Sequence, residues 1–137
     1  MKNQVLSIEQ MQKLKELGVD TSNASMHFLY MPTAKSIMSG VYEVDDEPEV
    51  FVSQNGMNHE HPTFTLQDII ELLPKSILIN SVKHWICVCP NCLLTEFQLM
   101  YVDGDYSYAV MKQDKSLLQA AYNMLIWVVE NGYLKTK

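Results

Sequence analysis

All three cysteines of the 137-residue chain lie close together, in the stretch HWICVCPNC at residues 84–92. Thiolates bind soft metal ions such as zinc, and a Cys-x-x-Cys pair is also the reactive unit of thioredoxin-type redox proteins. The stretch therefore suggests three hypotheses: a zinc site, a redox dithiol, or an ordinary β-strand that runs into a turn. The residues around it favour the strand.

A zinc site needs four ligands, usually from two Cys-x-x-Cys pairs that are well separated in sequence. This chain offers Cys87, Cys89 and Cys92, so the fourth ligand would have to come from His59 or His61. Nothing in the spacing requires either histidine to approach the cysteines. We therefore expect no metal and no cofactor. A small zinc-binding protein or enzyme centred on the three cysteines is the alternative.

A redox dithiol needs its Cys-x-x-Cys pair at the start of a helix, because the helix dipole lowers the pKa of the thiol. The residues after Cys92 lead instead into an alternating strand pattern. Thioredoxin-type proteins also present a downstream cis-proline, whereas the last proline of this chain is Pro90. We predict that Cys87 and Cys89 are small buried hydrophobic residues of a strand and that Pro90 begins a turn.

The sequence lacks the other familiar catalytic patterns. It contains no GxGxxG, Walker A, GxSxG or HExxH motif. Of the other histidines, His27 lies in a predicted strand and is expected to be half-exposed, and His84 falls on the strand face opposite Cys87. These observations favour a protein that is not an enzyme, although a site assembled from scattered residues is invisible at this level.

The net charge of −6 is unevenly distributed along the chain. The segment EVDDEPE at residues 43–49 contains five acidic residues and no basic one, so the rest of the chain is nearly neutral. This distribution provides no basic surface for nucleic acid. It also lacks the glycine and glutamate positions of an EF-hand loop. We predict a solvated connection, and docking of a basic partner is its alternative role.

Two features of the chain argue against membrane association. Its longest wholly apolar run, at residues 124–129, is much shorter than the roughly 20 residues that span a bilayer. The first residues, MKNQVLSIEQ, lack the apolar core of a signal peptide. We therefore expect a cytoplasmic protein with reduced thiols, folded as a single domain over residues 1–137.

The spacing of apolar residues predicts three helices, at about 8–17, 66–73 and 115–130. The first two begin with a capping box, in which a Ser or Thr caps the helix and the third helical residue returns a hydrogen bond. The two boxes are Ser7 with Gln10 and Thr65 with Asp68. Gly18 and Pro74 then end these helices.

The third predicted helix is apolar around nearly its whole circumference. A helix of this kind is buried on more than one side. Either the sheet and the other helices of its own chain cover it, or a second subunit does. We expect a homodimer whose interface includes part of this helix or the outer face of the hairpin described next.

Residues 95–111 alternate between apolar and polar side chains and predict a β-hairpin. Asp103 and Gly104 are favoured in a two-residue type I′ turn. In the register that this turn implies, Tyr101 opposes Tyr106, and Tyr108 points to the same inner face. Both strands would then agree on which face is apolar, although Met100, Val102 and Met111 also place apolar side chains on the other face.

The predicted fold class is α+β. Residues 76–80 and 83–89 form a strand pair in which Trp85, Cys87 and Cys89 share one face, and this pair joins the hairpin in one antiparallel sheet within 76–111. N-terminal strands are expected to add to this sheet at 26–31, 40–44 and 49–53. The sheet packs against the three helices, and the polar segment 53–63 is a connection.

Three stretches together resemble a family of small uncharacterised proteins from prophages and mobile elements of gut bacteria. They are LSIEQMQKLKELGVDTSNASM (6–26), PTFTLQDIIELLP (62–74) and SLLQAAYNMLIWVVENGYLK (116–135). The resemblance brings no activity and no site residue, and CVCPNC is not part of the pattern. It implies a non-enzymatic accessory or interaction protein of a mobile element, which acts in the bacterial cytoplasm on a protein partner that the sequence does not identify.

Overall fold

The computed structural model of the protein describes residues 4–40, 43–44, 47–54 and 61–134. Within these residues the helices are α1 (Ile8–Glu16), α2 (Ala34–Ser39), α3 (Leu66–Leu72) and α4 (Leu117–Glu130). The strands are β1 (Met26–Leu29), β2 (Glu49–Val52), β3 (His61–Thr63), β4 (Ser76–Ile79), β5 (Val82–Pro90), β6 (Phe97–Val102) and β7 (Tyr108–Asp114). The predicted α+β class and the three predicted helices are confirmed.

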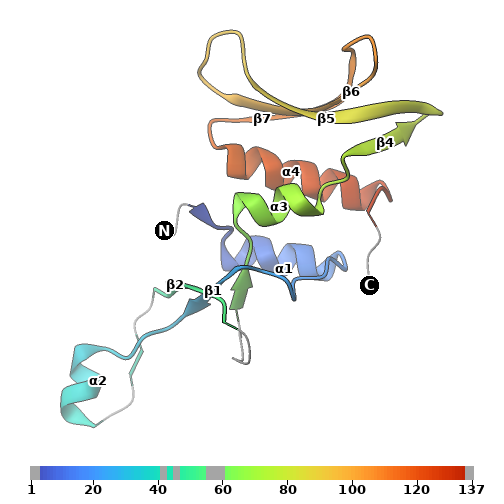
Figure 1. The fold of residues 1–137 in the computed structure, drawn as a ribbon. Helices are drawn as coiled ribbons and strands as arrows, with labels where there is room; N and C mark the ends of the chain where they lie inside the picture. Colours follow the sequence, from blue (N-terminus) through green and yellow to red (C-terminus); the bar gives the residue numbers. More distant parts are fainter. Residues whose placement is uncertain (1–3, 41–42, 45–46, 55–60, 135–137) are drawn as a thin grey trace.

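The strands form two separate antiparallel sheets (Figure 1). The larger has the order β4-β5-β6-β7, and the smaller, β2-β1-β3, lies away from it beside the helices. The prediction that strands within 26–31 and 49–53 extend the main sheet is therefore wrong. The physical reason is that β1 already pairs along both of its edges, with β2 and with β3. The third strand, β3, comes from the segment that we expected to be a connection.

Residues 40–44 do not form the predicted strand in the part that the structure describes, and residues 41 and 42 lie outside it. The short helix α2 precedes them, capped by the Thr33 side chain. An isolated β-bridge between Pro32 and Val44 closes this segment at its base. The result is an arm that carries α2 away from the rest of the molecule (Figure 1).

The predicted capping boxes hold the starts of α1 and α3. The Ser7 hydroxyl accepts a hydrogen bond from the backbone of Gln10 at 3.1 Å, and the Gln10 side chain accepts one from the backbone of Ser7 at 3.0 Å. Thr65 and Asp68 make the equivalent pair of bonds at 3.2 and 2.9 Å. Each box satisfies backbone donors that have no partner inside the helix.

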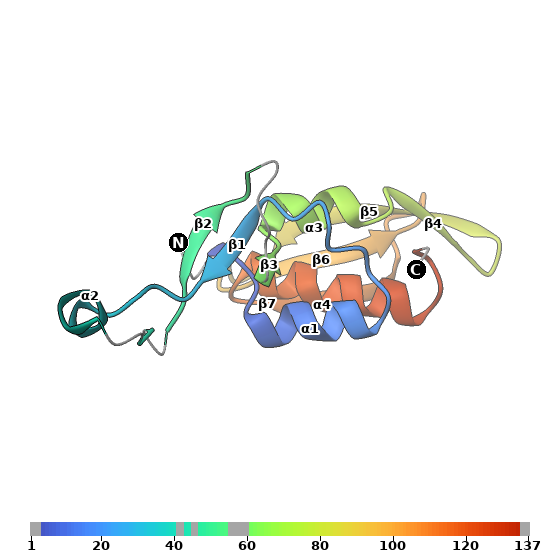
Figure 2. The same cartoon turned by 90° about the horizontal axis from the view of Figure 1, so that it is seen from below.

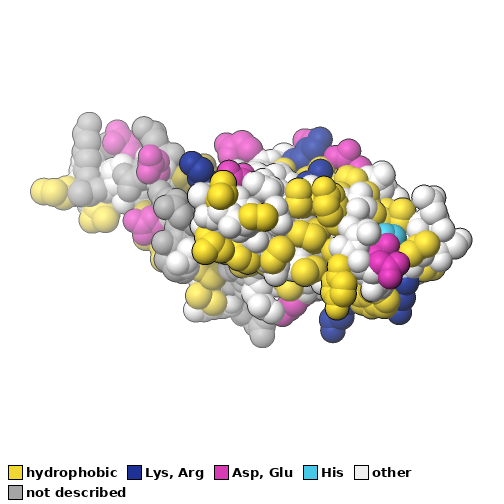
Figure 3. Space-filling model, turned by 90° about the horizontal axis from the view of Figure 1, so that it is seen from above, with side chains coloured by type: hydrophobic (Ala, Val, Ile, Leu, Met, Phe, Trp, Pro, Cys, Tyr) yellow, Lys and Arg dark blue, Asp and Glu magenta, His cyan; other side chains and the backbone are white. Residues whose placement is uncertain are grey.

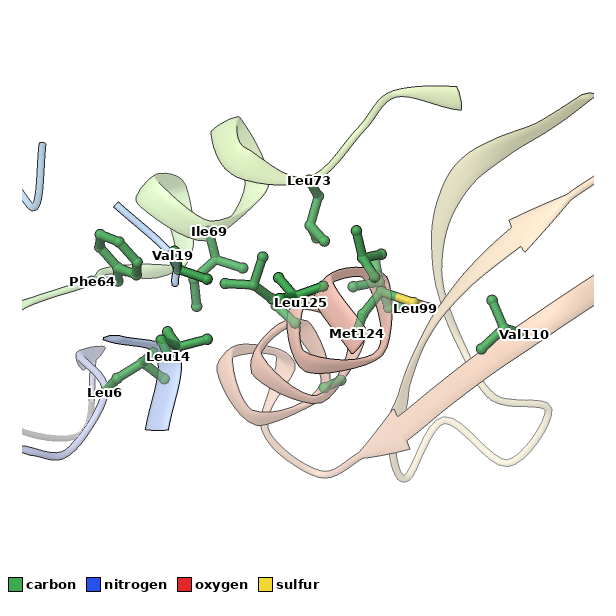
Figure 4. Packing of buried hydrophobic residues seen from close by; sticks show 14 of the residues in the cluster. Leu6, Leu14, Val19, Phe64, Ile69, Leu73, Leu99, Val110, Met124 and Leu125 are labelled. Carbon is green, nitrogen blue, oxygen red and sulfur yellow. The ribbon is translucent and has the colours of Figure 1, made fainter. Parts of the chain in front are cut away.

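The apolar helix α4 lies at the centre of the molecule. It packs against β6 and β7 on one side and against α3 on another, and α1 runs beside it in the same direction (Figure 2). Side chains of α4 such as Met124 and Leu125 meet Leu14 of α1, Ile69 of α3 and Leu99 of the sheet in one core (Figure 4). Its own chain therefore encloses most of the circumference of α4.

The β6–β7 hairpin forms, but its turn is longer than predicted. The Asp103 carboxylate accepts hydrogen bonds from the backbone of Asp105 at 2.9 Å and of Ser107 at 3.0 Å. Tyr106 adopts a left-handed backbone with φ of 62°. Residues 103–107 therefore form a five-residue loop, because the aspartate side chain organises a wider turn than the two-residue type.

The longer turn changes the register of the hairpin. Tyr101 pairs with Val110 instead of Tyr106, which is a shift of four residues. Because four is an even number, Tyr101 and Val110 still face the core. Next to the loop, Val102 pairs with Tyr108, which is a shift of only three residues, so Tyr108 points outwards and not inwards as predicted; an irregularity between Tyr101 and Val102 adds the fourth.

His27 is buried, with 2% of its surface exposed, and the prediction of a half-exposed side chain is wrong. It lies on β1, the central strand of the smaller sheet, where Phe51 and Pro62 flank it on the neighbouring strands. Its Nδ1 lies 3.5 Å from the hydroxyl of Ser53. A strand in the middle of a sheet has a neighbouring strand along each edge. The sequence of one strand does not reveal whether it occupies such a central position.

Candidate functional site

The outer face of the four-stranded sheet, which points away from the helices, is apolar in its central rows. Pairing between strands aligns Trp85 with Val102 and Val102 with Tyr108 in one row. The next row contains Cys87, Met100 and Met111. Side chains in such rows lie directly beside one another. We call these residues the outer-face patch: Trp85, Cys87, Met100, Val102, Tyr108 and Met111.

The outer-face patch is open to solvent. Trp85 and Tyr108 are 45% and 59% exposed. Seen from above, hydrophobic side chains gather across the sheet (Figure 3). The two hairpin loops at the ends of the sheet add large exposed hydrophobic residues: Leu93, Leu94 and Tyr106. Large exposed apolar patches mark interaction surfaces, so this face is a candidate for one.

The strand positions on this face carry a single charged side chain, Lys83, in the described structure. Its ammonium group lies 5.5 Å from the ring centroid of Trp85, where the ring attracts a cation. At the opposite end of the face, the amides of Gln98 and Gln113 share a hydrogen bond of 3.0 Å. Polar groups therefore border an apolar centre rich in aromatic and methionine side chains, as at the core of protein interfaces.

The cysteines lie on or beside this face. Cys87 and Cys89 occupy alternate positions of β5, as predicted, but they are only half-buried, and Cys92 is exposed in the following turn. All three are free thiols. Burial, followed by the neighbouring Cys87 and Cys92 thiols, raises the pKa of Cys89 above its usual range. A raised pKa is the opposite of what a redox nucleophile needs.

The turn after β5 agrees with the strand-and-turn interpretation of the cysteine stretch. The side-chain oxygen of Asn91 accepts hydrogen bonds from the backbone of Thr95 at 2.9 Å and of Glu96 at 3.3 Å. Cys92 therefore sits in a turn and not at the first turn of a helix. No helix dipole acts on it in the way that activates a thioredoxin-type dithiol.

The described histidines do not complete a metal site with the cysteines. His61 lies on β3 in the smaller sheet, and His84 points to the inner face, where its Nδ1 lies 2.8 Å from the carbonyl oxygen of Val82. His59 lies outside the described residues. Among the residues that are described, no three or more Cys, His, Asp or Glu side chains are grouped to hold a metal ion. The zinc hypothesis stays a prediction, which metal analysis of the purified protein would test.

The sequence indicated part of this face. It placed Trp85, Cys87 and Cys89 on one side of their strand, and the register confirms this. It placed Tyr108 on the inner side, which is wrong because the turn is longer. The sequence did contain a signal for this face, because Met100 and Met111 make the second face of the hairpin apolar as well. An antiparallel sheet with one face in solvent normally carries polar side chains there, so an apolar second face indicates a contact surface.

Fold and surface together define an α+β protein with an apolar sheet face that the described elements leave uncovered. No protein-family model matches the chain, and neither a curated protein nor a solved structure is similar to it. Across the described ranges, the helices are all too short or too polar to pass through a bilayer. The function must therefore be inferred from the surfaces of the chain itself.

We expect the thiols to differ in reactivity. In time-resolved alkylation at pH 8, followed by mass spectrometry of each site, Cys92 should react faster than Cys89. The raised pKa of Cys89 lowers its thiolate fraction, and its half-buried position restricts access. The rate at Cys89 should continue to rise at pH values where an unperturbed thiol has levelled off. Unfolded chain is the control, and equal rates in the folded chain would contradict the placement of Cys89.

Proposed function

We propose that this chain is a non-enzymatic interaction protein that forms a homodimer through the outer-face patch. The observation that supports the proposal is the contiguous apolar face of the four-stranded sheet, which the described part of the chain leaves uncovered. The resemblance to proteins of mobile elements further suggests an accessory role in the bacterial cytoplasm. The proposed homodimer is the assembly in which this role would be carried out.

A second copy is a suitable partner because the patch is compatible with itself. Lys83, the charged side chain at a described strand position of this face, lies beside the ring of its own Trp85. Glu49, the last residue of the acidic segment, begins β2, which lies on the side away from the four-stranded sheet (Figure 1). Two copies can therefore meet face to face without bringing their β2 strands, and Glu49 with them, together. Sheets packed in this way lie about 10 Å apart and interdigitate their side chains.

The expected strength of this contact is moderate. Burying the rest of a half-exposed large side chain contributes about 1 kcal/mol. Summed over the patch residues of two subunits, this gain is comparable with the roughly 4–15 kcal/mol that association costs. We therefore expect a reversible dimer and not a permanently assembled one.

Sedimentation equilibrium between about 1 and 100 μM tests the proposal. The wild-type mass should rise with concentration from the monomer value of 15.7 kDa towards twice that value. Tyr108→Lys places a charge in the patch and should weaken the dimer at least 100-fold, because an unpaired charge must then be buried. Val52→Lys is the matched control, since Val52 is similarly exposed, at 64%, but lies on β2.

Two results would overturn this proposal. The first is a monomer mass of wild-type protein over the whole concentration range. The second is a dimer that Val52→Lys weakens as much as Tyr108→Lys does. Circular dichroism of both variants, compared with wild type, shows whether each of them has folded.

A further inference from the structure

A cleft of about 900 Å³ opens where the first turns of α1 and α4 meet the smaller sheet. Figure 2 shows the two helices side by side, both beginning at the end nearest β1 and β3. The side chain of Gln10 donates a hydrogen bond of 2.8 Å to that of Gln119, which ties the two helix starts together. The cleft is therefore built on regular elements, and its volume suits a small ligand or a short peptide segment.

Apolar side chains form the deeper part of this cleft. Val5 and Phe28 are buried, each 6% exposed, while Ile8 and Leu118 are half-buried. A second hollow of about 630 Å³ shares Val5 and Leu118 with the first. The two hollows therefore adjoin at these apolar side chains, and we call them together the groove.

Carboxylates surround this apolar floor. They come from three separate parts of the chain: Glu9 of α1, Glu47 of the acidic segment, and Asp114 just before α4. Glu9 and Glu47 are exposed, and Asp114 is half-buried. Among the described residues that line the cleft there is no Lys, Arg or His. The rim of the groove is therefore acidic over an apolar floor.

The positive ends of the two helices do not cancel the negative charge of the cleft. A helix N-terminus carries about half a positive charge, so two of them offset roughly one of the three carboxylates. One backbone donor of each helix start is also occupied, because Ser7 accepts from Gln10 at 3.1 Å and Ser116 accepts from Gln119 at 3.3 Å. The Asp114 carboxylate accepts from the backbone of Ser116 at 2.8 Å. The cleft thus disfavours anions and suits a cation.

We propose that the cleft binds a basic peptide segment of a partner protein. Lysine or arginine side chains of that segment would lie against Glu9 and Glu47, and an apolar side chain between them would cover the floor at Leu118. An extended segment could lie across the two adjoining hollows, with its alternate side chains pointing to opposite sides. A second copy of the chain is a poor source of such a segment because its net charge is −6.

Fluorescence anisotropy with two labelled pentapeptides tests this proposal. The first probe alternates lysine with leucine, and the second alternates glutamate with leucine. We expect the lysine probe to bind, with an affinity that falls as salt is added, and the glutamate probe not to bind. The Tyr108→Lys variant should bind the lysine probe as wild type does, since the cleft lies apart from the outer-face patch.

Charge-matched variants decide whether the cleft is the site. Glu9→Gln combined with Glu47→Gln should weaken binding of the lysine probe about tenfold. Glu16→Gln combined with Glu130→Gln removes the same charge from exposed positions outside the lining residues and should change binding less than twofold. Equal losses in the two double variants, binding of both probes alike, or no binding of the lysine probe would each overturn the proposal.

Discussion

Replacing Leu125 by alanine is expected to lower the free energy of unfolding by about 2–5 kcal/mol. Leu125 is 0% exposed on the central helix α4, in the core that α1, α3 and the four-stranded sheet share (Figure 4). The shortened side chain would leave a cavity that neighbours on three different elements cannot all move to fill. Chemical denaturation at pH 7, with the slope of the transition unchanged, measures the loss.

Leu93→Ala is the matched control for this substitution. Leu93 lies in the turn between β5 and β6 and is 80% exposed. Its truncation should change the free energy of unfolding by no more than about 0.5 kcal/mol. If Leu125→Ala cost as little as Leu93→Ala, α4 would not be enclosed in the way that the structure describes.

The second large effect on the free energy of unfolding is expected for Tyr101→Phe, and the size of this effect should depend on pH. Tyr101 is 0% exposed, and its hydroxyl donates a hydrogen bond of 2.7 Å to the carbonyl oxygen of Pro74, at the end of α3. Phenylalanine keeps the packing but leaves this carbonyl without its donor. At pH 7 we expect a loss of about 1–3 kcal/mol in the free energy of unfolding.

The pH dependence follows from the burial of the same side chain. Burial raises the pKa of Tyr101 above its ordinary value of 10.0. The protonated hydroxyl therefore contributes stability that is fully present below about pH 10 and is lost as the pH rises further. Phenylalanine does not titrate, so the gap between wild type and Tyr101→Phe should narrow above about pH 10. Burial also raises the pKa of Tyr122, but this contribution is present in both proteins and cancels.

Denaturation curves of the two proteins between pH 7 and 11 measure this gap. A gap that stays constant, or that widens with pH, would contradict the buried position of the Tyr101 hydroxyl. Comparison of the two proteins at each pH removes the effects of groups that they share.

Features that depend on neighbouring residues in the sequence were predicted well. The capping box of Ser7 and Gln10 spans four residues, and α1 begins where it indicates. The same holds for Thr65 and Asp68 at the start of α3. The alternation along β5 placed Trp85 on the outer face. In each case the interaction that decides the structure lies within one turn or one strand.

Features that depend on distant partners were not predicted. The fragment Asp103-Gly104 suits a two-residue turn, and only the wider loop that the Asp103 side chain organises moves Tyr108 to the outer face. Along one of its edges β1 pairs with β3. This strand has three residues, one of them proline, and is too short to show an alternating pattern in the sequence. The acidic cleft needs α1 and α4 to meet, and their linking hydrogen bond joins residues 109 positions apart.

The order of strands in the larger sheet also bears on how the protein folds as it is synthesised. Each strand from β5 to β7 pairs with the strand before it, and α4 follows directly, so these elements need only short loops to close. The start of the chain is different, because the backbone of Leu6 donates to the carbonyl oxygen of Phe64 and α1 packs beside α4. Helix α1 therefore has its partners in β3 and α4, which are both made later, and it cannot be fully buried until α4 has been made.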